Sequence, residues 1–491
     1  MGRHFKQTVT GGVDPSASGA SQGAAPRAVL VAFVVVCACL CLVPFVGMAW
    51  APTTTTTENR ELAEVPVLLE DDGTLNSAYL SDWGTYFEDH FAYRNELVTL
   101  NAQLRATLFG VSATDSVVVG TDGWLYYGGT LSDYCGYALL SERGIDNIAF
   151  NLSLMEGYVE ANGAEFIVTF APNKNSLYSE NMPYYYVEGE ERNLASLEEA
   201  LSSYGVGYLS LMDVFSDEDE VLYYLRDTHW NTKGALLATQ SLLDALGETD
   251  EVSALEGLEV VEVDDYVGDL ASMLYPTAAE AETDYSYDAD LSWEYVEGES
   301  VEDSLVVTTG VGDSVLYMYR DSFANNMIPF FATAYGTACF TKLVPYDLTQ
   351  AAAYGADVVI IERAERNLAD LGTDPAIMPA PSLALEVSGE AGEAAEGLIT
   401  VEADGDYLVV SGDLPEEWQT ESVDMYIGLE GEDGAITWYV PFHTTTDEGD
   451  YGYKAYFTSG TWDGVQVVWL ACADGSSGDA ATSVGYVGID E

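Results

Sequence analysis

Three residue types that together carry out acyl transfer stand in two short runs of this chain. Asp227 and His229 are separated by a single residue, and Ser322 follows an apolar run that ends at Tyr319. A serine hydroxyl is a weak nucleophile at neutral pH, so it needs an imidazole to take its proton and a carboxylate to orient that ring. On an extended or turn segment, Asp227 and His229 can point the same way, which leaves the second ring nitrogen for the serine. The two runs therefore predict a Ser-His-Asp triad.

The choice of the base is narrow because the chain has only four histidines. His4 lies in the N-terminal tail and His443 in a separate C-terminal segment. His90 stands in an aromatic stretch of helical character, where we expect a packed or surface histidine. His229 is the one that remains.

Each run also has a structural explanation as a helix cap. Asp321 or Ser322 could cap a helix that begins near Phe323, because both residue types are favoured at the N-cap. Asp227 or Asn231 could likewise cap the helix expected after them, and an Asp-x-His pair is frequent by chance. The conjunction of the two runs within one domain is what favours catalysis.

The apolar pattern predicts an α/β fold, with a parallel sheet and helices on both faces. Apolar runs typical of buried strands occur at 166–170, 315–319 and 358–361, and they alternate with residues at helical spacing near 148–159 and 236–246. Ligands of such sheets bind at the carboxyl ends of the strands. Ser322 stands at such an end.

Composition divides the chain into further segments. We expect an N-terminal tail, a membrane anchor, a stalk, a catalytic domain, a linker and a C-terminal β-sandwich at 1–27, 28–50, 51–63, 64–373, 374–382 and 383–491. Within the catalytic domain, 256–303 is rich in Asp, Glu and Tyr and predicts an insertion or flap. Asp-Gly turns at short intervals favour the sandwich. Its aromatic residues could bind sugar rings, and the alternative is that they fill its core.

The segment 28–50 carries no charge and is long enough to cross a membrane as one helix. Arg3, Lys6 and Arg27 precede it, so the positive-inside tendency predicts a cytoplasmic N-terminus and an exterior catalytic domain in a single-pass protein. A cleaved signal peptide is the alternative, although the residues around Trp50 form a poor cleavage site.

The overall charge excludes one class of partner. Asp and Glu number 82 against 16 Lys and Arg, a formal net charge of −66, so binding of nucleic acid through a basic surface is not expected. We predict no metal and no cofactor, because the histidines are scattered, no Cys-x-x-Cys pair occurs and no Gly-rich phosphate loop is present.

The residues also resemble a known family. The runs Asp227-Thr228-His229-Trp230-Asn231 and Arg320-Asp321-Ser322-Phe323 resemble the DHHW family of SGNH hydrolase-like proteins, which are related to the alginate O-acetylation proteins of the bacterial envelope. Four further segments resemble motifs of that family, at 86–94, 120–127, 171–183 and 362–368. The likeness spans roughly Tyr86 to Leu371 and leaves the anchor, the stalk and the sandwich outside it.

The resemblance implies roles for individual residues. Ser322 is expected to be the nucleophile, His229 the base and Asp227 the residue that orients it. Arg320 replaces the glycine of the usual Gly-Asp-Ser block, and the usual Gly and Asn blocks no longer indicate the oxyanion hole. The remaining candidates for oxyanion or substrate binding are Lys174, Arg320 and Asn325, together with the backbone N–H of Ser322.

The expected function is that of an extracytoplasmic, membrane-anchored acyltransferase, which passes an acetyl group onto a cell-envelope or exported polysaccharide. The resemblance implies a membrane-embedded acyltransferase as the acyl donor. One alternative is a polysaccharide O-acetylesterase that uses the same triad. The other is a non-catalytic surface scaffold that binds glycan.

Overall fold

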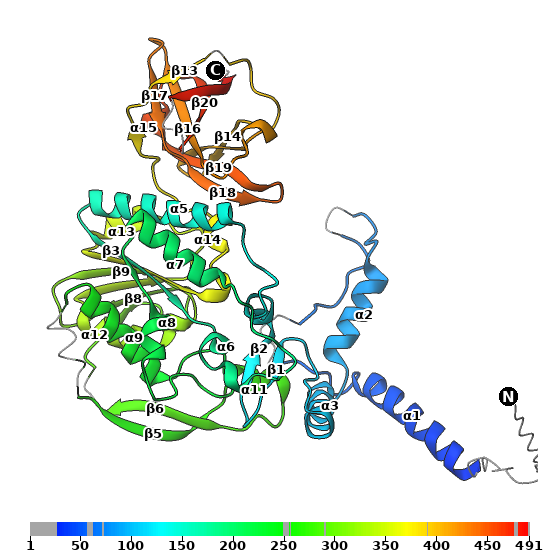
Figure 1. Cartoon of the computed structure of the whole chain (residues 1–491). Coiled ribbons are helices and arrows are strands. Elements are labelled where there is room, and N and C mark those ends of the chain that lie inside the picture. Colours follow the sequence, from blue (N-terminus) through cyan, green and yellow to red (C-terminus); the bar gives the residue numbers. More distant parts are fainter. Residues whose placement is uncertain are drawn as a thin grey trace, which may run out of the picture. The chain divides into compact units, whose positions relative to one another are not determined.

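The computed structural model of the chain describes residues 27–55, 62–70, 73–248, 255, 257–288, 291–389, 391–475 and 480–489 (Figure 1). The chain forms two compact units, Met1–Leu97 and Val98–Glu491. Helix α3 (Arg94–Phe109) includes the division between them. Each unit is described by itself.

The first unit contains α1 (Arg27–Gly47) and α2 (Tyr79–His90). Helix α1 has a mean hydropathy of 3.1 over its most apolar 18 residues, so by length and composition it can cross a membrane. This agrees with the predicted anchor, and a signal sequence has the same properties. The orientation of the chain across a membrane stays a prediction.

His90 has a structural role in this unit. Its two ring nitrogens lie 2.7 Å from the carbonyl oxygen of Thr53 and 2.8 Å from that of Ala63. Both nitrogens are therefore occupied by the backbone, which leaves none for catalysis.

A seven-stranded sheet forms the centre of the second unit, in the order β4-β3-β11-β9-β10-β8-β7. These strands are β3 (Glu165–Ala171), β4 (Tyr208–Leu209), β7 (Glu294–Glu297), β8 (Leu305–Thr309), β9 (Val315–Tyr319), β10 (Thr337–Thr341) and β11 (Val358–Ala364). The five strands from β4 to β10 pair in parallel, whereas β8 and β7 pair antiparallel at one edge. The predicted α/β class is confirmed, and the antiparallel edge is an addition to the expected parallel sheet.

Helices cover both faces of this sheet. The residues of β3 alternate between two cores: Phe166 and Val168 belong to one, and Ile167 to the other. Helices α5 (Glu142–Ala161), α7 (Asn193–Tyr204) and α13 (Leu348–Tyr354) bury apolar residues in the first core. Helices α8 (Leu211–Ser216), α9 (Thr232–Ala245) and α12 (Ile328–Ala334) do so in the second.

Smaller elements gather around the loops of this domain. The hairpin β1 (Val117–Val119) and β2 (Leu125–Tyr127) shares an apolar cluster with α11 (Asp269–Leu274), which lies in the acidic segment predicted as an insertion. That segment also contains the hairpin of β5 (Glu259–Tyr266) and β6 (Glu282–Asp288). The remaining short helices are η1 (Gly128–Thr130), α4 (Leu131–Tyr134), α6 (Lys174–Leu177), η2 (Ser179–Asn181), η3 (Phe323–Asn326), η4 (Glu365–Asn367) and α14 (Asp370–Thr373).

The C-terminal part contains two sheets that enclose a core, as expected for a sandwich. One sheet has the order β12-β17-β16-β20-β21-β13 and the other β14-β15-β19-β18. Val410, Ile427, Phe457 and Leu470 meet between the two sheets. The elements are β12 (Ser382–Leu383), β13 (Val387–Ser388), β14 (Thr400–Asp404), β15 (Tyr407–Asp413), η5 (Glu416–Trp418), β16 (Val423–Gly431), β17 (Ile436–Tyr439), β18 (Phe442–Thr446), β19 (Gly449–Thr458), α15 (Ser459–Trp462), β20 (Val465–Asp474) and β21 (Ala481–Gly488).

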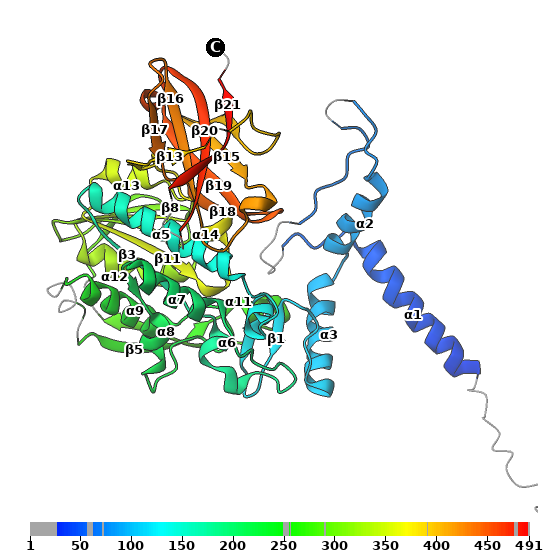
Figure 2. The ribbon, with the colours of Figure 1, turned by 45° about the horizontal axis from the view of Figure 1, so that its top comes forward.

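The sandwich lies against α5 of the α/β domain (Figure 2). Buried polar groups join the two. Asn151 exchanges two hydrogen bonds with the backbone of His443, at 2.8 and 2.9 Å, and Arg143 donates to Nδ1 of the same histidine at 3.1 Å. Burial, together with the charge of Arg143, holds the pKa of His443 well below its usual value. His443 is therefore a neutral residue of this interface.

Asn231 fixes the start of α9, the helix that follows the predicted catalytic histidine. Its Oδ1 accepts hydrogen bonds from the N–H groups of Lys233 and Gly234, each at 3.1 Å, and its Nδ2 donates to the carbonyl of Val221 at 2.9 Å. The cap is thus Asn231, and the carboxylate of Asp227 is available for another role.

We expect Asn231→Ala to lower the free energy of unfolding by about 1–2 kcal/mol, because it removes this cap. Urea denaturation of the full chain in detergent, followed by tryptophan fluorescence, measures the change. Lys233→Ala, which removes an ion pair with Glu220 and a contact with the Tyr285 ring but keeps the backbone N–H that Asn231 caps, is the control and should cost less than about 1 kcal/mol. Equal effects of the two variants would contradict the assignment of the cap.

Candidate active site

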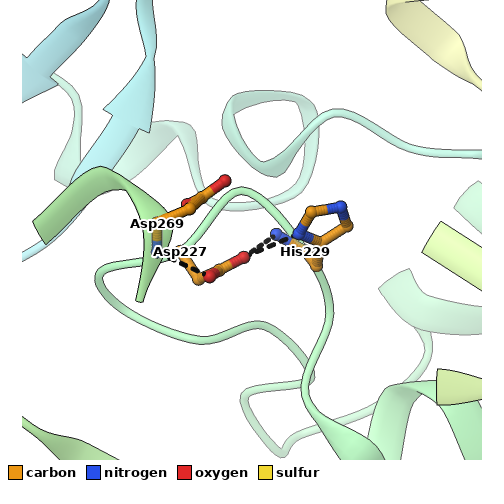
Figure 3. Close-up of side chains that lie close together, drawn as sticks. All are labelled: Asp227, His229 and Asp269. Atoms are coloured by element: carbon orange, nitrogen blue, oxygen red, sulfur yellow. Dashed lines mark hydrogen bonds and ion pairs between the residues drawn. The ribbon is translucent and has the colours of Figure 1, made fainter. Parts of the chain in front are cut away.

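Asp227 and His229 lie in a loop whose two ends are joined by backbone hydrogen bonds. The amide of Asn231 donates to the carbonyl of Leu222 at 2.8 Å, and that of Tyr224 donates to the carbonyl of His229 at 3.3 Å. The loop therefore folds back on itself before α9 begins, and Figure 3 shows the carboxylate of Asp227 directed at the imidazole of His229.

Ser322 stands in the turn after β9, and its neighbour Asp321 holds that turn in place. Oδ1 of Asp321 accepts from the amide of Phe323 at 2.9 Å, and its Oδ2 accepts from the amide of Ala364 at 2.8 Å. The side chain of Ser322 makes no capping hydrogen bond to η3. The cap in this run is therefore Asp321, which leaves the Ser322 hydroxyl for other contacts.

The structure brings the three predicted triad residues together. His229 Nδ1 lies 2.7 Å from Asp227 Oδ1, and His229 Nε2 lies 2.8 Å from Ser322 Oγ. Because a carboxylate can only accept, the proton belongs on Nδ1, and Nε2 is left to accept the serine proton. This is the geometry that general-base activation of a serine requires.

The carboxylate of Asp227 is held by residues that the sequence did not indicate. It is 3% exposed, and besides the bond from the His229 ring it accepts from the His229 amide at 2.9 Å. Its second oxygen accepts from the Tyr266 hydroxyl and from the Asp269 amide, each at 2.8 Å. Burial acts to raise the pKa of Asp227, but the hydrogen bonds and the charge of His229, with these amides, hold it well below its usual value. Asp227 is thus a buried ionised carboxylate.

Asp269 is a second carboxylate beside this pair. Its side chain accepts from the amide of Thr228 at 2.8 Å and from the Thr228 hydroxyl at 2.7 Å. Burial and the nearby charge of Asp227 raise the pKa of Asp269. Among the described residues, Asp227, His229 and Asp269 have ligand atoms close enough to share a metal ion (Figure 3), but these atoms are engaged by one another and by Thr228.

Opposing effects set the pKa of His229. Burial disfavours the charged ring, but the hydrogen bond that the ring donates to Asp227, the charge of Asp227 and the charge of Asp269 outweigh burial and raise the pKa of His229 above its ordinary value. The charge of Arg366 acts in the opposite direction. The ring is 22% exposed, so solvent and substrate reach the site.

Lys174, a predicted oxyanion or substrate-binding residue, contacts the backbone of the triad loop. Its Nζ donates to the carbonyls of Tyr224 and Leu225, each at 3.1 Å, and to that of Asp227 at 2.6 Å. These three acceptors match the three N–H groups of an ammonium. Burial lowers the pKa of Lys174 to about 7, so one of the three donors is lost as the pH rises above that value. These contacts are those of a side chain that positions the loop.

Arg320 and Asn325, the other two candidates, bind the segment before β8. Arg320 is fully buried and donates to the carbonyls of Val301 and Asp303, each at 2.9 Å, and also to Oδ1 of Asn325. Asn325 donates in turn to the Glu302 carboxylate at 2.7 Å. The side chains of Arg320 and Asn325 therefore connect the Ser322 turn to the segment before β8.

Arg366 is a further residue beside the triad that sequence reasoning did not single out. It lies in η4, and its guanidinium carbon is 5.1 Å from the centre of the Phe323 ring and 5.6 Å from that of Tyr127. Together with Thr228 it lines a small cavity. Its place after β11, next to the strand that leads to Ser322, is the signal that could have found it.

A model of a known protein family matches part of this chain. Residues 117–310 match the family model of the SGNH hydrolase-like domain of the acetyltransferase AlgX. The match includes Asp227 and His229 and ends before Ser322. The sheet and this match define an SGNH hydrolase-like domain, which confirms the resemblance seen in the sequence. The domain is of the AlgX acetyltransferase type, so the chain carries an SGNH-like O-acyltransferase or esterase domain.

Solved structures with a similar fold include three bacterial proteins. PatB1 of Bacillus cereus is 17% identical and covers 51% of this chain and 96% of its own, with a TM-score of 0.43. A DHHW family protein of Eubacterium siraeum is 14% identical, covering 53% and 95%, with a TM-score of 0.40. AlgX of Pseudomonas aeruginosa is 12% identical, covering 75% and 90%, with a TM-score of 0.34. Because these identities and TM-scores are low, the assignment of an SGNH hydrolase-like domain rests on the match to the family model.

A curated relative matches a smaller part of the chain. Cadherin-16 of Oryctolagus cuniculus is 36% identical over 107 residues, which are 20% of this chain and 13% of the cadherin. The chain thus spans a small fraction of the length of that relative.

The pKa of His229 leads to a test by chemical labelling. A protonated ring cannot accept the serine proton, so labelling of Ser322 by a fluorophosphonate should slow as the pH falls through the pKa of His229, with a midpoint above 6.5. Asp227→Asn removes the negative charge that raises this pKa. It should move the midpoint to lower pH and slow labelling on the order of 10³–10⁴-fold. Labelling rates of the full chain in detergent across pH 5–9 measure both effects, and a midpoint unchanged by Asp227→Asn would contradict the pairing.

Proposed function

We propose that the chain is a membrane-anchored serine acyltransferase that acts outside the cytoplasm and O-acetylates a cell-envelope or exported polysaccharide. The observation that carries the proposal is the chain of two short contacts from Asp227 through His229 to Ser322. The AlgX-type domain supports acetyl as the transferred group, and α1 supports attachment to a membrane. The sugar acceptor is supported by the family alone.

The first half of the reaction acylates the enzyme. Ser322 Oγ attacks the carbonyl carbon of the acyl donor while its proton passes to His229 Nε2, and the carbonyl oxygen becomes an oxyanion. Collapse of this intermediate breaks the bond to the donor's leaving group, which takes the proton from His229. The products are an ester on Ser322 and the protonated leaving group.

The second half reverses these steps with a sugar hydroxyl in place of the leaving group. His229 takes the proton of the hydroxyl, whose oxygen attacks the ester on Ser322, and the proton then returns to Ser322 Oγ. Asp227 stays ionised throughout and stabilises the imidazolium that forms twice in each cycle. The backbone N–H of Ser322, which takes part in no hydrogen bond between described residues, is available to the oxyanion.

The acyl donor is part of the same proposal. An SGNH-like acetyltransferase outside the membrane needs an acyl group that has crossed the bilayer, and a membrane-embedded acyltransferase would supply it. An anchor at α1 would hold the domain close to such a partner.

Replacement of the nucleophile tests the proposed activity in the producing cell. We expect Ser322→Ala to abolish the chain-dependent O-acetylation of polysaccharide, because no ester can form without the hydroxyl. Ester content measured by NMR of the extracted glycan before and after mild alkali shows the loss. The matched control is Ser314→Ala, since Ser314 also follows an aspartate but precedes β9. Unchanged acetylation in Ser322→Ala would refute the proposal.

Water competes with the sugar as acceptor, because His229 is partly exposed. For the full chain in detergent with p-nitrophenyl acetate, we expect added glycan to receive acetyl groups and release of free acetate to fall correspondingly. Mass spectrometry of the glycan and quantification of acetate separate the two products. Release of acetate alone, with no acetylated glycan, would make the chain an O-acetylesterase.

A further inference from the structure

Arg366 and Ser322 follow neighbouring parallel strands. β11 pairs in parallel with β9, and Arg366 lies two residues after β11 while Ser322 lies three residues after β9. The carboxyl ends of parallel strands meet at one edge of a sheet. The hydrogen bond from the Ala364 amide to Asp321, at 2.8 Å, ties the two turns together at that edge.

The side chain of Arg366 is held by aromatic rings near the triad. Its guanidinium lies over the rings of Phe323 and Tyr127, and the Phe323 ring is 4.7 Å from the ring of His229. A guanidinium held near aromatic rings by cation–π contacts can still donate its N–H groups to another molecule. The rings thus orient the group without using its donors.

The donors of Arg366 have no acceptor within the part of the chain that the structure describes. No hydrogen bond or ion pair joins this side chain to another described residue. Arg192, Arg226 and Arg363 by contrast pair with carboxylates, those of Glu365, Glu280 and Asp370. In a chain with 82 acidic and 16 basic residues, an arginine at this edge without a carboxylate partner in the described part has N–H groups that are available to a ligand.

We infer that Arg366 donates hydrogen bonds to the acyl carbonyl oxygen and stabilises the oxyanion formed when Ser322 attacks, which makes it a further catalytic residue. This inference rests on the proposed function. In the tetrahedral intermediate the new bond is from Ser322 Oγ to the acyl carbon, the serine proton is on His229 Nε2, and the negative charge on the former carbonyl oxygen faces the guanidinium. The charge of Arg366 counts most when that oxygen is an anion, so it lowers the barrier more than it tightens binding.

Turnover of p-nitrophenyl acetate by the full chain in detergent tests this role. We expect Arg366→Gln to lower kcat by on the order of 10²–10³-fold with a change in KM of less than about threefold, as for loss of an oxyanion donor. Arg366→Lys, which keeps the charge and loses the planar fork, should retain an intermediate rate. Lys454→Gln is the matched control, since it removes a cation 5.0 Å from the ring of Tyr456 in the sandwich, and it should keep the parent rate.

The pH profile gives a readout that a merely structural role would not move. The groups whose charges act on His229 are Asp227 and Asp269, which raise its pKa, and Arg366, which lowers it. Arg366→Gln should therefore shift the acidic limb of the rate to higher pH, and Arg366→Lys should leave it in place.

The outcomes separate this inference from the proposed function. An inactive Ser322→Ala together with a fully active Arg366→Gln would overturn the role of Arg366 and leave the serine mechanism standing. A rise in KM at constant kcat in Arg366→Gln would also overturn it, because that result describes binding of an anionic group in the ground state. Equal losses in Arg366→Gln and Arg366→Lys with an unmoved acidic limb would show a structural role only.

Discussion

The site depends on keeping the carboxylate of Asp227 ionised while it is buried. Burial of a charged group costs on the order of several kcal/mol unless hydrogen bonds and an opposite charge replace its contacts with water. Asp227 meets this requirement with four donors from three residues: the ring and amide of His229, the hydroxyl of Tyr266 and the amide of Asp269. The acidic segment that carries Tyr266 and Asp269 is thereby bound to the catalytic centre.

Two further anchors hold the halves of the triad at one edge of the sheet. Lys174, which follows β3, donates hydrogen bonds to three carbonyl oxygens of the loop that carries Asp227 and His229. Asp321, just after β9, binds the turn of Ser322 to the end of β11 through Ala364. Since β3, β11 and β9 are adjacent strands, the contact of 2.8 Å between His229 and Ser322 is set by the spacing of the sheet.

The local sequence was sufficient to predict that Asp227, His229 and Ser322 lie together, but not the residues that support them. Ser322 and His229 stand in short runs next to elements with clear periodicity, and the competing cap roles belong to their neighbours Asp321 and Asn231. Tyr266 contacts Asp227 across 39 residues, from an acidic segment without periodicity, so no local pattern connects the two. The position of Arg366 was visible in the sequence, but its lack of a carboxylate partner is a property of the folded chain.

The acidity of the chain acts on catalysis through the few charges next to His229. Asp227 and Asp269 raise the pKa of this ring, which makes it a stronger base but reduces the neutral fraction that can accept a proton at a given pH. Arg366 opposes both carboxylates, so it keeps more of the ring neutral while leaving the hydrogen bond from His229 Nδ1 to Asp227 intact. The remaining surface carboxylates are more distant and are screened by salt over roughly 8–10 Å. A single cation near His229 therefore weakens the effect of the two carboxylates, and the pKa of His229 stays above its ordinary value.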